Sequence, residues 1–581
     1  MKKINWLIIF ILLVAVILRL YNLGEFPNYL TPDEASLGYN AYSILHTAKD
    51  EYGTFLPLVF KSFGDYKPGL YVYLTVPYTA IFGLNEWSVR LPSALLGVLS
   101  VWLIYQITQL VFPHKHFKIK NLQLEIGHFS ALALSLSPWH IQFSRGAWEA
   151  QVSLTLTLMG IWLFLTSLTN STKLVSLPFR EVKQLISPER LLYLSSILFG
   201  LTLWTYQGAK ISTLLVLIAL VLVYAKLALK SFSKKTLFTS FILLIIITIP
   251  IALGLLTGTA GRLKTKNIFS YQPSLQEIQQ SILEPAHISQ TSVSYLLFHN
   301  QGLYYLRAIL NRYFNYFSGK FLFAEGDWAH PQLTPIYMGV IYWLDLLALI
   351  FGILFLIRQT TRYKYFILIW LLLSPLPGAI TLDQINSVRT LNMIIPLAFL
   401  IGFGWYYIFI KVVQQKLLIK ICLLFLILFI MLFQMIYYLD SYYLLSPKIT
   451  TQNAQGYGYK QAVQSLQPYR HANYKIIVQQ SYDQPYIYFL LYEKFSPQKY
   501  HQVAYLQENQ YGDVGLINQI DQQIEFRNFS FNAEKHLKGN IYIGDLIHLP
   551  SSATADAQSF KEIQNIYYPN GQIALRVIEI L

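Results

Sequence analysis

Long apolar runs, separated by short polar stretches, fill most of the chain up to about residue 440. A helix needs roughly 20 apolar residues to cross a hydrocarbon core of about 30 Å. Eleven runs have about this length: residues 4–23, 88–112, 124–143, 149–169, 190–207, 211–229, 236–257, 336–357, 363–381, 389–410 and 418–439. The pattern therefore predicts a polytopic α-helical membrane protein with about eleven transmembrane helices.

One further apolar segment, residues 69–82, is shorter and contains Pro77. As a helix it would rise only about 21 Å, less than the hydrocarbon core, so we predict that it lies in the membrane interface. With eleven spans, the clusters of Lys and Arg all fall in loops on one side, which the positive-inside rule identifies as cytoplasmic. The N-terminus is then cytoplasmic, and the first apolar run is a retained helix because no small-residue cleavage site follows it.

This topology divides the chain into two parts. Residues 1–439 form a membrane module with two large external loops, residues 24–87 and 258–335. Residues 440–581 form an extracytoplasmic mixed α/β domain, for which no role is predicted. Its expected elements are strands at 474–480 and 540–548, a helix at 484–494, and a hairpin at 566–580 that turns around Gly571.

Composition agrees with a membrane location and argues against a nucleic-acid partner. The 581-residue chain is 54% hydrophobic and 13% charged, whereas soluble domains average about 25% charged residues. The net charge is +15, but the segment from residue 440 onward holds eleven Lys/Arg and twelve Asp/Glu. The positive excess therefore belongs to the membrane part, where cytoplasmic loops collect it, and the expected surroundings are the lipid bilayer of the plasma membrane.

The first external loop carries an acidic pair, Asp33 and Glu34, soon after the first span. Thr31, Pro32 and Glu34 have the pattern of a helix N-terminus with a capping box, which is a purely structural explanation for Glu34. Asp33 is not needed for that motif and is left to face a cleft. We therefore take Asp33 as the main candidate for a catalytic acid or base, with Glu34 beside it.

Several cations lie at the predicted outer ends of spans, where the positive-inside rule disfavours them. A phosphate partner would explain their position, whereas snorkelling towards the membrane surface is the alternative. Asp65 also offers Lys67 a local partner. The candidate phosphate-binding residues are Lys67, Arg90, Arg262 and Arg389.

A second polar cluster is expected on the same face, from His140, Arg145, Glu149, Asp327 and His330. Arg145 and Glu149 are four residues apart and can simply pair with each other. Alternatively, Glu149 and His140 join Asp33 in binding a divalent metal, since carboxylate and imidazole are suitable ligands. Spacing alone does not support that site, and no cofactor is predicted with certainty.

The chain resembles the GT-C superfamily of polyprenyl-phosphate-dependent glycosyltransferases over about residues 5–440. It is nearest to the bacterial relatives of protein O-mannosyltransferases, lipid A aminoarabinose transferases and Rgt lipopolysaccharide sugar transferases. The matching segments, in chain order, are Pro32–Glu34, Lys67–Tyr71, Val89–Ala94, Glu325–Asp327 and Ser387–Arg389. Pro68 and Gly69 stand where the family usually has two prolines.

The resemblance implies a GT-C-like fold and a site on the extracytoplasmic face. Asp33 would be the catalytic acid of the first loop, Lys67 would hold the lipid phosphate, and Arg262 would supply the middle-loop arginine. The implied reaction moves a sugar from a polyprenyl-phosphate donor to a hydroxyl of a protein, lipid or glycan, with inversion. Two other readings remain open: a lipid-linked-glycan transporter or flippase, and a non-catalytic envelope protein. A transporter would be expected to carry charges within its spans, whereas here nearly all charges lie at span ends.

Overall fold

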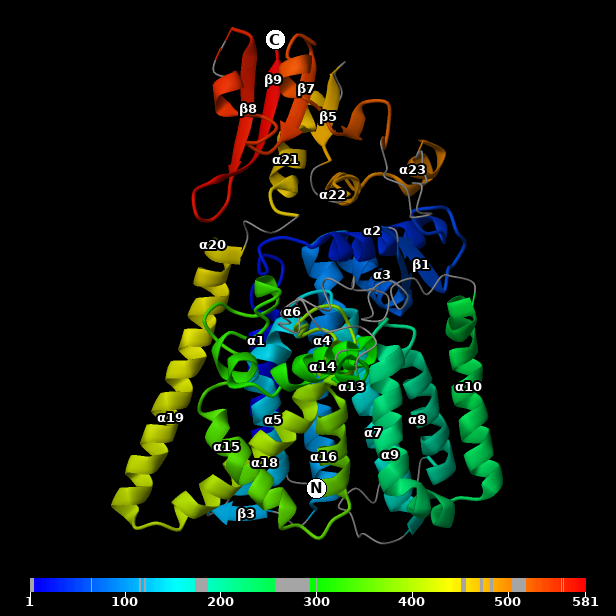
Figure 1. Ribbon diagram of the computed structural model, residues 1–581, viewed down its shortest axis with the longest axis vertical. Coiled ribbons are helices and arrows are strands. Elements are labelled where there is room, and N and C mark those ends of the chain that lie inside the picture. Colours follow the sequence, from blue (N-terminus) through cyan, green and yellow to red (C-terminus); the bar gives the residue numbers. More distant parts are fainter. Residues whose placement is uncertain are drawn as a thin grey trace. The chain divides into compact units, whose positions relative to one another are not determined.

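The structure is a computed structural model of the whole chain (Figure 1). It describes residues 5–63, 65–113, 116–119, 122–172, 186–256, 293–298, 300–450, 456–470, 474–480, 484–503, 519–554, 556 and 558–581.

The chain forms two compact units, and each is built from segments that are far apart in the sequence. Unit 1 comprises Met1–Leu12, Ser100–His140 and Ser153–Met435. Unit 2 comprises Leu13–Leu99, Ile141–Val152 and Ile436–Leu581. The first external loop and the C-terminal segment therefore belong to the same unit.

Helices dominate unit 1. It contains α5 (Ile126–Leu136), α8 (Pro188–Thr202), α9 (Ala209–Ser231), α10 (Lys234–Leu256), α13 (Val293–Phe298), α14 (Gln301–Asn315), α15 (Asp345–Ile357), α16 (Tyr363–Leu373), α17 (Leu376–Ala379), α18 (Ile394–Val413), a β3–β4 hairpin (His116–Ile119 and Leu122–Glu125), and most of α7 (Glu149–Thr172) and α19 (Leu417–Asp440). Three further helices, α1 (Trp6–Leu20), α4 (Glu86–Val111) and α6 (Pro138–Arg145), contribute residues to both units.

The centre of unit 1 is α18, which packs against α5, α15 and α16. Two glycines set the close approach of α15 and α18. A Cβ on Gly352 would lie 1.9 Å from the carbonyl oxygen of Leu400, and one on Gly404 would lie 1.8 Å from that of Ala348. Small residues commonly permit such contacts between membrane helices, because apolar lipid provides little hydrophobic drive to press helices together.

The helices of the described residues have the length and composition of membrane spans. Six are long and apolar enough to cross a bilayer, within Glu86–Val111, Glu149–Ser171, Ala209–Ser231, Lys234–Gly254, Leu391–Val413 and Leu417–Ile449. Shorter apolar helices include Trp6–Leu20, Ile126–Leu136 and Asp345–Ile357. The predicted class, a polytopic helical membrane protein, is confirmed, while the number of spans stays a prediction.

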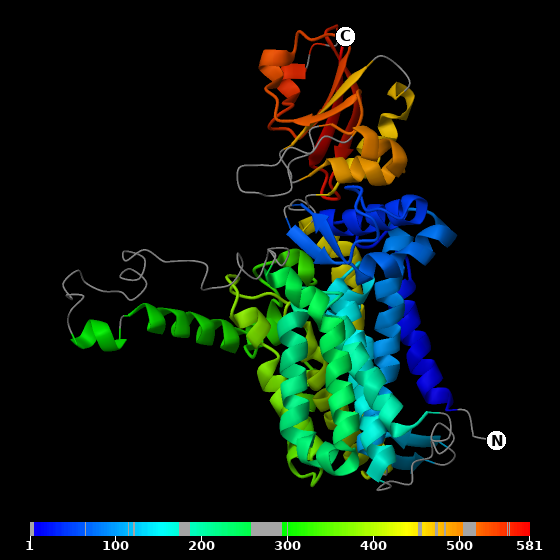
Figure 2. The same cartoon turned by 90° about the vertical axis from the view of Figure 1, so that its right-hand side faces the viewer.

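The second external loop contains an amphipathic helix, α14, which follows the short helix α13. Within unit 1, α14 runs across the direction of the bundle helices (Figure 2) and buries none of its side chains. Leu306, Leu310 and Phe314 are exposed along it, as in a helix that lies on a membrane surface.

Unit 2 combines the first external loop with the C-terminal segment. Its loop elements are α2 (Pro32–Thr47), β1 (Val59–Ser62), β2 (Asp65–Pro68) and α3 (Leu70–Phe82). Its C-terminal elements are α20 (Ser446–Thr450), α21 (Tyr459–Ser465), β5 (Lys475–Gln479), α22 (Tyr486–Tyr492), α23 (Pro497–Val503), β6 (Ile524–Arg527), α24 (Phe531–Glu534), β7 (Asn540–Gly544), β8 (Phe560–Tyr567) and β9 (Ile573–Ile580).

The C-terminal strands form one mixed sheet in the order β6-β5-β7-β9-β8. Strands β6, β5 and β7 are parallel, and β9 runs antiparallel to both β7 and β8. Alternate residues of β5 enter opposite cores: Ile476 and Val478 pack on one face, and Ile477 packs on the other. Burial on both faces explains the nearly continuous apolar strands, and the mixed α/β fold expected for this segment is confirmed.

Helix α2 of the first loop shares the larger of these cores, because it packs against α22 and α23. Leu30 and Tyr39 lie in the same buried cluster as Tyr488. Two hydrogen bonds reinforce the contact: the Tyr488 hydroxyl donates to the Leu30 carbonyl at 3.1 Å, and the Tyr39 hydroxyl donates to the Phe495 carbonyl at 3.1 Å. The C-terminal segment therefore supports the helix that begins with the acidic pair.

Candidate functional site

The N-terminus of α2 places the acidic pair. The Thr31 hydroxyl accepts from the Glu34 backbone N–H at 3.2 Å, and Glu34 Oε2 accepts from the Thr31 backbone N–H at 3.0 Å. This is the capping box expected from the sequence. It directs Glu34 inward, where it is 5% exposed, whereas the Asp33 side chain is 48% exposed. The two neighbouring acids therefore have different surroundings.

Lys67 is the charged partner of Asp33. Its ammonium group forms a very short ion pair with Asp33 Oδ1. Lys67 lies on β2, opposite Phe60 of β1, and its ammonium is 5.7 Å from the centre of the Phe63 ring. The lysine is buried and the aspartate is half-exposed, so a buried cation is paired with an accessible carboxylate.

Gly69 explains how the chain enters α3 directly after Lys67. Its backbone N–H donates to the Leu58 carbonyl at 3.0 Å. A Cβ on residue 69 would lie 2.5 Å from the Phe60 ring, so the close packing of the β1–β2 hairpin requires glycine. A larger residue at this position would force the Phe60 ring, which lies opposite Lys67 in the hairpin, to move.

Arg90 is bound from all sides by protein groups. It is fully buried, and its Nε–H donates to Glu34 Oε1 at 3.0 Å. Its other nitrogens donate to three backbone carbonyls, those of Leu23, Pro27 and Tyr29, at 2.6–3.0 Å. Four of its five N–H groups are thus occupied. This geometry favours a structural role over the predicted contact with a lipid phosphate.

Arg145 is also buried. Its chain segment is joined to Glu34, because the Ala147 backbone N–H donates to Glu34 Oε1 at 2.9 Å. Arg145 donates to the Tyr442 hydroxyl at 3.0 Å and to the Leu18 and Phe26 carbonyls at 3.1 and 3.2 Å. Its guanidinium also lies over the Tyr442 ring, with its carbon 5.3 Å from the ring centre. These contacts give Arg145 a place in the packing of unit 2 that does not depend on the predicted pair with Glu149.

Glu149 begins α7 and is half-buried. Burial raises the pKa of the Tyr71 hydroxyl, and the negative charges of Glu34 and Glu149 raise it further. Unit 2 contains six of the residues singled out in the sequence: Asp33, Glu34, Lys67, Arg90, Arg145 and Glu149.

Glu51 is a buried carboxylate that the sequence reasoning missed. Its Oε1 accepts from the Asn40 amide at 3.0 Å, and its Oε2 accepts from the Tyr486 hydroxyl at 3.1 Å. Ser36 contacts both Glu51 and Ser62 of β1. The group joins α2, the β1–β2 hairpin and α22. The only signal in the sequence was a second acidic pair, Asp50 and Glu51, in the same loop.

Glu51 should make the stability of the protein depend on pH. Burial raises its pKa to about 7, well above the usual 4.5, against the opposing hydrogen bond from Asn40. Because the folded-state pKa is the higher one, the folded protein binds the proton more tightly. Stability should therefore fall as pH rises from about 4.5 to 7, by up to about 3 kcal/mol. Thermal unfolding across this range measures the effect, and Glu51→Gln should flatten the curve. A parallel curve for Glu51→Gln would contradict this assignment.

A second polar group forms within unit 1. Asp327 is fully buried, and its Oδ2 accepts from the Ser387 backbone N–H and hydroxyl at 2.6 and 2.8 Å. Its Oδ1 accepts from His330 at 3.0 Å, and this hydrogen bond raises the pKa of the histidine. Arg389 binds Asp383 Oδ2 at 2.5 Å and the Thr381 hydroxyl at 2.7 Å. Asp327, His330 and Arg389 thus belong to one loop system of unit 1, whereas Arg145 and Glu149, which the sequence analysis grouped with Asp327 and His330, belong to unit 2.

His140 is fully buried in unit 1, and the neighbouring Trp139 donates to the Ser387 carbonyl at 3.2 Å. Among the described residues, no three His, Cys, Asp or Glu side chains are grouped so as to hold a metal ion. His140 belongs to unit 1, whereas Asp33 and Glu149 belong to unit 2, and the metal site of Glu149, His140 and Asp33 stays a prediction. Arg262 lies outside the described residues.

A polar cavity of about 190 Å³ lies within unit 2. Pro27 and Tyr29 line it, and their carbonyls are two of the acceptors that hold Arg90. The lining also includes Lys460 of α21, which pairs with Glu86 at 2.8 Å. Its carboxylate, amide and tyrosine groups, which include Glu25, Gln461, Gln464 and Tyr492, suit a hydroxyl-rich ligand.

Comparison with solved structures identifies the fold. ArnT from Cupriavidus metallidurans bound to undecaprenyl phosphate matches with a TM-score of 0.53 at 12% identity, covering 99% of this chain and 98% of that one. ArnT in the apo state matches with a TM-score of 0.52 at 13% identity, covering 98% and 97%. The Archaeoglobus fulgidus oligosaccharyltransferase tethered with an acceptor peptide matches with a TM-score of 0.50 at 13% identity, covering 99% and 74%. No protein-family profile and no curated protein sequence matches the chain.

Proposed function

We propose that this chain, which has the fold of GT-C membrane glycosyltransferases, transfers a sugar from a polyprenyl-phosphate donor to a hydroxyl acceptor on the extracytoplasmic face. The observation that carries the proposal is the ion pair between half-exposed Asp33, at the start of α2, and buried Lys67 of β2. The proposed location is the plasma membrane, with the N-terminus in the cytoplasm and the C-terminal segment outside.

The similar structures support a lipid-linked donor. One of the ArnT structures is bound to undecaprenyl phosphate, and the archaeal oligosaccharyltransferase is tethered with an acceptor peptide. Both proteins share the fold of this chain over nearly its whole length. A donor that is anchored in the bilayer would also suit a reactive carboxylate in a loop that directly follows a membrane helix.

The geometry suggests how the two charged groups divide the chemistry. Asp33 takes the proton from the acceptor hydroxyl as its oxygen forms a bond to the anomeric carbon. The bond from that carbon to the phosphate oxygen breaks, and the electron pair leaves with the phosphate. Lys67, released from Asp33, stabilises the charge that grows on that phosphate. Attack from the side opposite the phosphate inverts the anomeric centre.

The test uses the full-length protein in lipid nanodiscs with polyprenyl-phosphate sugars and, separately, with nucleotide sugars. Extracted envelope lipids and proteins are supplied as acceptors, and we expect mass spectrometry to detect a glycosylated acceptor only with the lipid-linked donors. Transfer from nucleotide sugars would exclude the proposed donor class. Movement of intact lipid-linked sugar across the bilayer, with no new glycosidic bond, would instead indicate a flippase.

Loss of the Lys67 charge should weaken use of the lipid donor. A hydrogen bond to a charged group contributes about 1.5–3 kcal/mol, so Lys67→Met should lower kcat/KM for the donor roughly 10–100-fold. Lys67→Arg should restore part of this because it keeps the charge. The matched control is Lys61→Met on the neighbouring strand β1. In the hairpin register, Lys61 lies opposite Tyr66, whereas Lys67 lies opposite Phe60. Equal losses in both Met variants would show that the hairpin, and not the charge, is responsible.

A further inference from the structure

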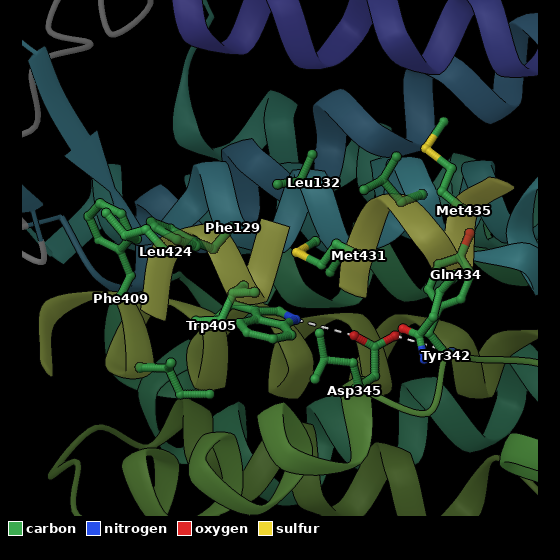
Figure 3. A pocket seen from close by; sticks show the side chains of 15 residues that line it. Phe129, Leu132, Tyr342, Asp345, Trp405, Phe409, Leu424, Met431, Gln434 and Met435 are labelled. Carbon is green, nitrogen blue, oxygen red and sulfur yellow. Dashed lines mark hydrogen bonds between the residues drawn. The ribbon is translucent and has the colours of Figure 1, made fainter. Parts of the chain in front are cut away.

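Unit 1 contains an apolar pocket of about 150 Å³ that the proposed reaction does not use (Figure 3). It lies between α19 on one side and α5, α15 and α18 on the other. Helix α19 packs loosely here, since Tyr438 is its only buried residue. Most of the lining is aliphatic or aromatic, as in Phe129, Phe409, Leu424 and Met431.

The polar groups of the pocket gather at one end, around Asp345, Tyr342 and Gln434, whereas Phe409 and Leu424 lie at the other end (Figure 3). Asp345 Oδ1 accepts from the Trp405 indole N–H at 3.2 Å, and Oδ2 accepts from the Tyr342 backbone N–H at 3.3 Å. These two bonds leave acceptor capacity on the carboxylate, which can receive about four. The Tyr342 hydroxyl is buried and has no hydrogen-bond partner in the described part of the chain.

The pocket is lined by one acidic side chain and no basic one. Asp345 is its single acidic or basic side chain, and no cation forms an ion pair with it among the described residues. A carboxylate within a membrane helix is costly unless it is paired, and such residues usually mark a functional site. An anionic head group would be repelled here, so this pocket does not suit a phosphate-bearing lipid. A head group that donates hydrogen bonds would satisfy Asp345.

We propose that this pocket binds a membrane amphiphile with an apolar chain and a non-anionic, hydrogen-bond-donating head, either an ammonium or a hydroxyl group. The head lies between Asp345 and the Tyr342 hydroxyl. The chain extends past Met431 towards Phe409 and Leu424, in the gap beside α19. Trp405, whose indole N–H donates to Asp345 Oδ1, holds the carboxylate in place beside the head group.

Trp405 provides a direct probe of occupancy. The full-length protein in nanodiscs is titrated with brominated C18 amphiphiles that differ only in the head group: an amine, an alcohol and a carboxylic acid. Bromine quenches nearby tryptophans, and subtraction of the Trp405→Phe signal isolates this pocket from the other ten tryptophans. We expect saturable quenching by the amine or the alcohol at concentrations at least tenfold lower than for the acid. Stronger binding of the amine identifies an ion pair, and equal binding of amine and alcohol identifies a neutral hydrogen bond.

Two variants distinguish a built site from general lipid contact. Asp345→Asn should remove the preference for amine and alcohol over acid. Tyr342→Phe, which loses only an unpartnered hydroxyl, should weaken binding several-fold without lowering the unfolding temperature. The matched control is Phe425→Leu, an exposed position on α19 outside the pocket, and it should bind as the wild type does. Identical curves for the three head groups, or for wild type and a folded Tyr342→Phe protein, would overturn the proposal.

Discussion

Replacing Asp33 by Asn should lower the rate of sugar transfer by about 10²–10⁴-fold, the usual contribution of a general base. The substitution keeps the shape of the side chain and leaves the capping box of Thr31 and Glu34 intact. It removes the group that accepts the proton from the acceptor hydroxyl. Single-turnover transfer from a pre-bound lipid donor is the appropriate measurement, because it separates chemistry from donor binding.

The ion pair with Lys67 requires a further control, since Asp33→Asn also leaves a buried lysine without its charged partner. Asp33→Glu keeps the negative charge but moves it by one methylene group, so it should remain stable and still transfer slowly. Asp556→Asn, an exposed carboxylate of the C-terminal segment, should retain full activity. Near wild-type transfer by a folded Asp33→Asn protein would reject Asp33 as the base.

Removing the charge of Glu34 should destabilise unit 2 by about 3–5 kcal/mol, the cost of leaving one member of a buried ion pair alone. Glu34→Gln isolates this effect, because glutamine can still complete the capping box with Thr31. Arg90 would keep its three backbone carbonyl acceptors but lose its only carboxylate partner among the described residues. Thermal unfolding of the detergent-solubilised protein measures the loss.

An exposed ion pair gives the comparison for this prediction. Lys475 and Glu525 pair at 2.7 Å, but the lysine side chain is 54% exposed. Lys475→Met should therefore cost less than about 1 kcal/mol. The double variant Glu34→Gln with Arg90→Met should be less destabilised than the sum of the two single variants. Additive losses would show that the two residues do not act as a pair.

Local patterns in the sequence were sufficient for many elements of the fold, although not for the β1–β2 hairpin or for β6. Apolar runs of membrane length identified the helices of unit 1, because in a bilayer every backbone hydrogen bond must be satisfied within the segment. Thr31 and Glu34 identified the start of α2, since a capping box depends on residues only three positions apart. The hairpin around Gly571 and the strand that contains Ile476 were predictable for the same reason: their signals lie within a few residues.

Partners that are distant in the sequence were decided only by the tertiary structure. Lys67 had a local candidate in Asp65, but its partner is Asp33, 34 positions away. Arg90 was a candidate for phosphate binding, with snorkelling to the membrane surface as the alternative, and in the structure it is buried against Glu34 and the carbonyls of the first loop. Glu51 and Asp345 stood out only when burial and hydrogen bonding were known. Charge and hydropathy along a chain determine which residues must leave water, whereas the packing of distant segments determines which groups meet there.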